Sequence, residues 1–214
     1  MAIDVRSVLF KKMWVIAALF IKRICKAARK YLKLGLIHMN VVPWLLTTIL
    51  FLSSALNAAT GNSVVSVNPP VPAPNWTLPA IQNAEGDLSL SEFKGKITYI
   101  DFWASWCGPC RLSLPALNSL NAEFDASKVQ FIAVSIDVVE EDAWDFLKRY
   151  AVDYPVVIDT ESEIARLFAV DGMPSGYLLD ADGRVREIHI GYKSGDEIKL
   201  AESIKKLLLE MDAS

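Results

Sequence analysis

Two cysteines separated by two residues follow an apolar run, and this arrangement constrains the fold of the chain more than any other part of the sequence. The run covers residues 97–103 and is typical of a buried strand, and the motif Trp106-Cys107-Gly108-Pro109-Cys110 comes shortly after it. The pattern predicts a strand-to-helix turn with the first cysteine at a helix N-terminus. Because unpaired backbone N–H groups there stabilise a thiolate, the pair can close and reopen a small disulfide by exchange.

Two other roles are open to the cysteine pair. A closed tetrahedral zinc site needs more ligands than the pair supplies, and only Cys25, His38 and His189 remain as soft or imidazole candidates. A purely structural disulfide is compatible with an exported protein, but a ring of so few residues closes almost no loop and adds little stability. We therefore favour a redox-active dithiol that holds no metal.

Charge is distributed unevenly along the chain. Residues 1–59 hold nine Lys or Arg and one acid, whereas residues 60–214 hold 13 Lys or Arg and 24 acids. A basic start before apolar sequence is typical of export. The remainder shows no basic stripe with aromatic residues for holding phosphates, so we expect no nucleic-acid partner.

An uncharged segment links the basic start to the rest of the chain. Residues 34–84 contain no charged side chain, and residues 41–52 are mostly apolar. This run suits the apolar region of a signal peptide, with the small residues at 53–59 as the cleavage region. Residues 34–56 are also long enough to span a bilayer as an uncleaved anchor. Under either interpretation the C-terminal part of the chain is exported.

Composition divides the chain into three parts. We expect residues 1–59 to hold the basic region with the signal peptide or anchor, residues 60–75 to form an extended Pro-rich tether, and residues 76–214 to form one domain. In the domain the patterns predict a hairpin over 76–90, a helical turn closed by Gly95, and then alternating strands and helices. Strands are expected at 97–103, 129–136, 154–159, 176–179 and 185–190, and helices at 107–124, 140–150, 161–168 and 195–211.

This order of elements favours an α/β fold. Strands 97–103 and 129–136 are apolar almost throughout, which is typical of strands covered on both faces. The first long helix is expected to bury a face formed by four apolar residues, and it contains Pro115, which removes an N–H inside the helix. The four residues are Leu112, Leu117, Leu120 and Phe124.

The dithiol after a strand, the alternating elements and a proline before the last hairpin resemble the thioredoxin fold. The resemblance is to the TlpA/ResA-like periplasmic thiol-disulfide oxidoreductases of the redoxin (AhpC-TSA) superfamily, and it covers residues 76–211. It rests on Asp101-Phe102-Trp103-Ala104-Ser105-Trp106-Cys107-Gly108-Pro109-Cys110, on Gly172-Met173-Pro174 and on extra helical sequence between them. It implies a thioredoxin-like fold, with a central mixed sheet flanked by helices, an N-terminal hairpin and a helical insert.

The resemblance also implies catalytic roles. Cys107 matches the exposed attacking thiolate and Cys110 the more buried resolving thiol. Asp101 matches a buried acid that exchanges a proton with the resolving cysteine, and burial should raise its pKa. A strand acid that is merely hydrogen-bonded near the end of the sheet is the alternative. Pro174 matches a cis-proline that faces the dithiol.

The same resemblance implies substrate contacts. The backbone of Met173 is expected to pair with a bound peptide strand, and Trp106, Gly108 and Pro109 are expected to contact the substrate. The dipeptide Ser175-Gly176 departs from the Thr or Glu that relatives carry after the proline. This departure weakens any expectation of a haem-protein substrate.

The function implied is exchange or reduction of disulfides in extracytoplasmic proteins by a monomer without a cofactor. Electrons would come from a membrane thiol donor, and the protein would be periplasmic, either soluble after cleavage or tethered to the inner membrane. A peroxiredoxin-like peroxidase is the enzymatic alternative, but neither dithiol cysteine lies in the Pro-x-x-x-Thr-x-x-Cys pattern of that branch. A non-catalytic binding module of the same fold is the third alternative. Because Gly108-Pro109 matches reducing thioredoxin at about −270 mV, we expect a potential below about −200 mV.

Overall fold

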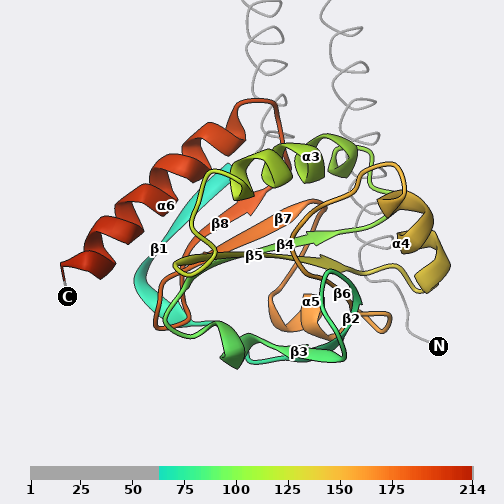
Figure 1. Cartoon of the computed structure of the whole chain (residues 1–214), viewed down its shortest axis with the longest axis horizontal. Coiled ribbons are helices and arrows are strands. Elements are labelled where there is room, and N and C mark those ends of the chain that lie inside the picture. Colours follow the sequence, from blue (N-terminus) through green and yellow to red (C-terminus); the bar gives the residue numbers. More distant parts are fainter. Residues whose placement is uncertain (1–62, 214) are drawn as a thin grey trace, which may run out of the picture. The chain divides into compact units, whose positions relative to one another are not determined.

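The computed structural model describes residues 63–213 (Figure 1). The predicted signal peptide or anchor and Cys25 lie in residues 1–62, outside the described range. Between residues 63 and 213, no helix combines the length and the apolar character needed to cross a membrane.

The strands of the described residues form one mixed sheet. β4 and β5 pair in parallel, as do β5 and β6, and all other neighbours pair antiparallel. The α/β prediction with a central mixed sheet is therefore confirmed. The order across the sheet is β1 (Ser63–Pro72), β8 (Arg184–Ile190), β7 (Ser175–Leu179), β4 (Ile97–Trp103), β5 (Val129–Ser135), β6 (Val156–Ile158), β2 (Thr77–Gln82) and β3 (Asp87–Ser89).

Helices cover both faces of the sheet. α3 (Cys110–Asn121), α4 (Glu140–Leu147) and α6 (Asp196–Asp212) contribute to one apolar cluster, and α5 (Glu163–Leu167) contributes to the other. Figure 1 shows α3 and α6 above the sheet and α5 below it. Side chains of β4 alternate between the clusters, because Tyr99 and Trp103 belong to the first and Ile100 and Phe102 to the second. This alternation places Asp101 on the face covered by α3.

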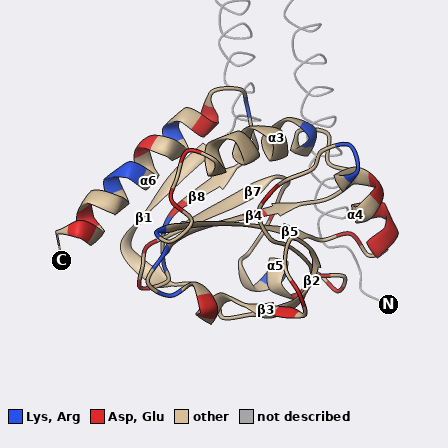
Figure 2. Cartoon of the chain, in the orientation of Figure 1, with Lys and Arg blue, Asp and Glu red and all other residues tan. Residues whose placement is uncertain are grey.

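Charged residues lie mainly on the helices and loops. Figure 2 shows acidic and basic residues interspersed along α6 and acidic residues at the start of α4. Glu140, Glu141 and Asp142 occupy the first turn of α4. Acids at a helix N-terminus complement the helix dipole, which explains why the helix begins at this point.

The tether predicted for residues 60–75 is wrong where the structure describes it. Residues 63–72 form the edge strand β1, which pairs with β8 from Ser63↔Ile190 to Ser66↔Glu187 and again from Val71↔Val185. Pro69 and Pro70 lie in the interruption between these two stretches. Proline has no N–H for a ladder but is tolerated in edge strands and bulges, so Pro-rich composition does not exclude a strand.

The first long helix also differs from the prediction. It begins at Cys110 after Pro109, so Cys107 lies in the preceding turn, and it ends at Asn121. Leu112, expected in the core, is 63% exposed, and Leu114 is fully buried instead. The predicted hairpins are present as β2–β3 and β7–β8.

Candidate active site

The dithiol lies where β4 passes into α3. Cys107 and Cys110 form a disulfide with their Cα atoms 5.3 Å apart. The backbone N–H of Cys110 donates a hydrogen bond to Cys107 Sγ at 3.2 Å. This N–H belongs to the start of α3, where unpaired donors and the helix dipole favour negative charge. The same contact would stabilise Cys107 as a thiolate after reduction.

The two cysteines differ little in exposure while the disulfide is closed. Cys107 is 3% exposed and Cys110 is fully buried, so the expectation of an exposed Cys107 is wrong for this oxidised form. The neighbours are open, because Trp106 is 66% exposed and Gly108 and Pro109 are also exposed. The Cys107 sulfur is therefore nearly covered, while these three residues next to it are open to solvent.

The proline loop lies beside the dithiol turn. The Met173–Pro174 peptide bond is cis. Ser175 pairs with Phe102 across β7 and β4, so this loop ends next to the end of β4 from which the dithiol turn starts. Pro174 is buried and Met173 is half-buried against the core.

Asp101 is a buried acid near the middle of the sheet. It is 2% exposed, and its Oδ2 has no hydrogen-bond partner among the described residues. Burial raises the pKa of Asp101 to about 8, because the apolar surroundings penalise the charged carboxylate. A carboxyl group with such a pKa can both take and give a proton near neutral pH.

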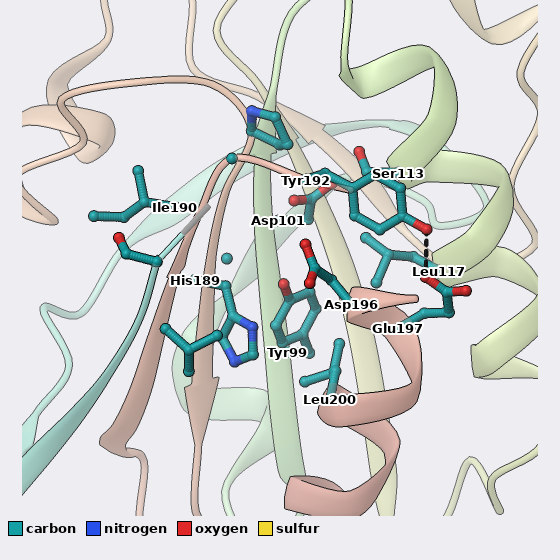
Figure 3. A pocket seen from close by; sticks show the side chains of 15 residues that line it. Tyr99, Asp101, Ser113, Leu117, His189, Ile190, Tyr192, Asp196, Glu197 and Leu200 are labelled. Atoms are coloured by element: carbon teal, nitrogen blue, oxygen red, sulfur yellow. Dashed lines mark hydrogen bonds between the residues drawn. The ribbon is translucent and has the colours of Figure 1, made fainter. Parts of the chain in front are cut away.

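A small cavity brings the predicted acid, helix α3 and the proline loop together (Figure 3). Asp101 lines it with Ser113, which lies one turn after Cys110 on α3, and with Pro174. Tyr99, His189 and Asp196 line other parts of it, and the volume is ≈ 20 Å³. The geometry thus brings the strand acid next to the helix that begins at Cys110.

A second buried acid, Asp137, holds the dithiol turn in place. Its carboxylate accepts the Ser105 backbone N–H at 2.9 Å, the Ser105 hydroxyl at 2.7 Å and the Ser135 hydroxyl at 2.9 Å. Ser105 lies two residues before Cys107. Sequence reasoning missed Asp137, although a signal existed, since Ser105 and Asp137 each come two residues after one of two adjacent parallel strands.

The described residues offer no metal centre. Between residues 63 and 213, no group of three or more His, Cys, Asp or Glu side chains could hold a metal ion. His189, a zinc candidate from the sequence, is 3.2 Å from Glu187 through its Nε2 and packs edge-on against Tyr99. These contacts give His189 a structural role in the β8 wall of the cavity.

Known proteins are similar to this chain in sequence. The redoxin family model matches residues 69–204. The thiol-disulfide oxidoreductase ResA of Bacillus thuringiensis subsp. konkukian is 30% identical over 135 residues, which cover 63% of this chain and 76% of the relative.

Solved structures agree with the sequence relatives. A Chlorobium tepidum protein with the provisional name thiol:disulfide interchange protein DsbE is 35% identical with a TM-score of 0.59, covering 68% of this chain and 99% of its own. A thiol-disulfide oxidoreductase from Bacteroides fragilis is 27% identical with a TM-score of 0.54, covering 61% and 98%. The chain therefore belongs to the redoxin family and is a thiol-disulfide oxidoreductase of the thioredoxin fold.

Proposed function

We propose that this protein reduces disulfides of exported proteins through the Cys107/Cys110 dithiol. The observation that carries the proposal is a disulfide at the start of α3, directly after a strand that holds a buried acid of raised pKa. The helix N-terminus suits Cys107 as the attacking thiolate. The complete burial of Cys110 suits it as the resolving thiol, because it is out of reach of a protein substrate.

The reaction proceeds in two exchanges. The Cys107 thiolate attacks one sulfur of the substrate disulfide, forms a mixed disulfide and releases the other substrate sulfur as a thiolate. The Asp101 carboxylate then takes the proton of the Cys110 thiol, and the Cys110 thiolate attacks Cys107 Sγ. The second substrate sulfur leaves as a thiolate, so two electrons have passed to the substrate and the enzyme disulfide is closed.

The substrate contacts come from two sides of the dithiol. The exposed Trp106, Gly108 and Pro109 provide one side, and the backbone of Met173 before Pro174 provides the other. An extended peptide that pairs with this backbone places its cysteine beside Cys107.

The proposed setting is the periplasm, with a membrane thiol donor that reduces the enzyme disulfide and with the enzyme acting as a monomer. Support comes from the basic and apolar sequence of residues 1–59, which suits a signal peptide or an inner-membrane anchor. Support for the reducing direction comes from Gly108-Pro109 between the cysteines.

Trapping of mixed disulfides tests the assigned roles. In a Cys25→Ser background, which removes the third thiol of the chain, Cys110→Ser should accumulate disulfide-linked substrate proteins because resolution is blocked. Cys107→Ser in the same background should accumulate none. Insulin reduction should be lost in both variants, and equal trapping by both would overturn the order of attack.

A further inference from the structure

The cavity beside Asp101 has the size and the lining of a buried water site. Its volume of ≈ 20 Å³ exceeds the roughly 10–15 Å³ that one water needs. Asp101 lines it with a buried and unpartnered Oδ2. A buried polar atom without a protein partner commonly bonds to an ordered water, so the unpartnered oxygen points to a water ligand.

Tyr99 gives the same cavity a hydroxyl group, and Gly176 makes room for it. A Cβ atom built at Gly176 would lie 1.8 Å from the Tyr99 hydroxyl, so only glycine leaves this position open. Gly176, the second residue of the Ser175-Gly176 dipeptide, thus lines the cavity. Burial raises the pKa of Tyr99 above its usual value, and the charges of Asp101 and Asp196 raise it further. The carboxyl groups of Asp101 and Asp196 therefore both interact electrostatically with the Tyr99 hydroxyl.

Asp196 connects the cavity with solvent. It is the first residue of α6, its side chain is 18% exposed, and it also lines the cavity. Its carboxylate accepts the Lys193 backbone N–H at 2.8 Å and lies 3.1 Å from Lys199 Nζ at the surface. Figure 3 shows the carboxyl groups of Asp101 and Asp196 and the Tyr99 ring around one central space.

Two other polar side chains of the cavity wall have hydrogen-bond partners of their own. Tyr192 donates its hydroxyl hydrogen to Glu197, and His189 is bonded to Glu187. Tyr154, whose pKa is raised by burial and by the Asp101 charge, does not line the cavity. Of the other carboxylates that line the cavity, Glu197 lies against Tyr192, whereas Asp196 faces the same space as Asp101 (Figure 3). Among the described residues, Asp196 is therefore the lining carboxylate best placed to exchange a proton with Asp101.

We infer that a water bound between Asp101, Tyr99 and Asp196 carries the Asp101 proton to solvent, with Asp196 as the outer acceptor. The Asp101 carboxyl gives its proton to the water, the water passes a proton to the Asp196 carboxylate, and Asp196 releases it to bulk solvent. Asp101 is left as the carboxylate that can deprotonate Cys110. Asp196 and Tyr99 act through Asp101 and do not touch the sulfur atoms.

This inference rests on the proposed role of Asp101 as a base, and its test is a pH profile. Reduced full-length protein is mixed with a peptide disulfide in single-turnover experiments, and resolution of the mixed disulfide is monitored from about pH 6 to about pH 9. Asp196→Asn and Tyr99→Phe should each slow resolution about 10-fold near pH 6, less than the about 10²–10⁴-fold expected for loss of the base itself. The loss should disappear near pH 9, where Asp101 has already released its proton.

Two variants serve as matched controls. Glu197→Gln changes the neighbouring carboxylate of the same wall, and Tyr154→Phe removes a buried hydroxyl outside the cavity. Both variants should resolve the mixed disulfide at the wild-type rate over the whole pH range. Wild-type rates near pH 6 in both Asp196→Asn and Tyr99→Phe, or equal losses at every pH, would overturn the exit route. If Asp101→Asn itself resolves at the wild-type rate, the base role fails; if it is slow while both exit variants are normal, only the exit route fails.

Discussion

Replacing Asp101 with Asn should stabilise the oxidised protein, and the gain should grow as the pH rises. Burial raises the pKa of this carboxyl from 3.8 to about 8 in the folded state. Below about pH 4 the carboxyl is protonated in both the folded and the unfolded chain, so its ionisation costs nothing. As the pH rises from about 4 to about 8, the unfolded chain loses this proton while the folded protein keeps it. Wild-type stability therefore falls by about 1.4 kcal/mol per pH unit through this window from this group alone.

The size of this effect is large relative to the stability of a domain. The loss of unfolding free energy from this carboxyl is about 4 kcal/mol at pH 7 and levels off near about 6 kcal/mol above pH 8. The total unfolding free energy of a typical domain is about 5–15 kcal/mol. Asn keeps the shape of the side chain without the ionisation. The unfolding free energy of Asp101→Asn should consequently lack the decline with rising pH that this carboxyl causes in the wild type.

Urea unfolding of the oxidised wild type and Asp101→Asn at pH 5, 6 and 7 measures the difference directly. Contributions of other ionisable groups cancel between the two proteins, so the difference in unfolding free energy should widen by about 1 kcal/mol or more per pH unit. An infrared carboxyl band that titrates near pH 8 in the wild type and is missing in the variant would agree. A difference that stays constant with pH would refute the raised pKa of Asp101.

Three further substitutions probe the surroundings of the dithiol. Asp137→Ala should cost about 3 kcal/mol of unfolding free energy, because it leaves the half-buried donors of Ser105 and the buried hydroxyl of Ser135 unpaired. It should also slow Cys107 alkylation, and unchanged stability by urea titration would contradict this prediction. Gly176→Ala should cost about 1–3 kcal/mol because its Cβ meets the Tyr99 hydroxyl, and a wild-type melting temperature would contradict the close approach. Trp106→Ala should change stability by less than about 0.5 kcal/mol but raise KM for insulin, and an unchanged KM would remove Trp106 from the substrate surface.

The central strands β4 and β5 were predictable because their residues are mostly apolar on both faces. The limits of 97–103 match β4, and every residue of this strand is buried. The position of Asp101 within that run predicted its raised pKa. A carboxyl group in a strand that is covered on both faces loses the hydrating water that stabilises its charged form. Its raised pKa results from the same burial.

Other parts of the fold depended on contacts that lie far apart in the sequence. Pro69 and Pro70 suggest a tether when considered alone, and only the ladder between β1 and β8 shows that they occupy a bulge at the edge of a sheet. The sequence pattern predicted Leu112 on the buried face of the first long helix, but it is exposed. The buried face of α3 instead includes Leu114 and Leu117.

The cysteine pair of the candidate site was predictable from the sequence, whereas the positions of Asp137 and Asp196 were not. A cysteine pair after a strand indicates a dithiol from local sequence alone. Asp137 and Asp196 lie far in the sequence from Ser105 and Asp101, and they come close to these residues only when β5 and α6 pack beside β4. Buried polar networks of this kind are specified by tertiary packing and leave little local pattern.

The reduction potential of the dithiol tests the central claim most directly. Equilibration of the full-length protein with a glutathione or reference dithiol buffer, read out by thiol labelling of Cys107 and Cys110, gives the value. A reductant of disulfides requires a potential below about −200 mV, and each 30 mV corresponds to about 1.4 kcal/mol for the two-electron couple. A potential above about −150 mV would make the protein an oxidant and would contradict the proposed direction of electron flow.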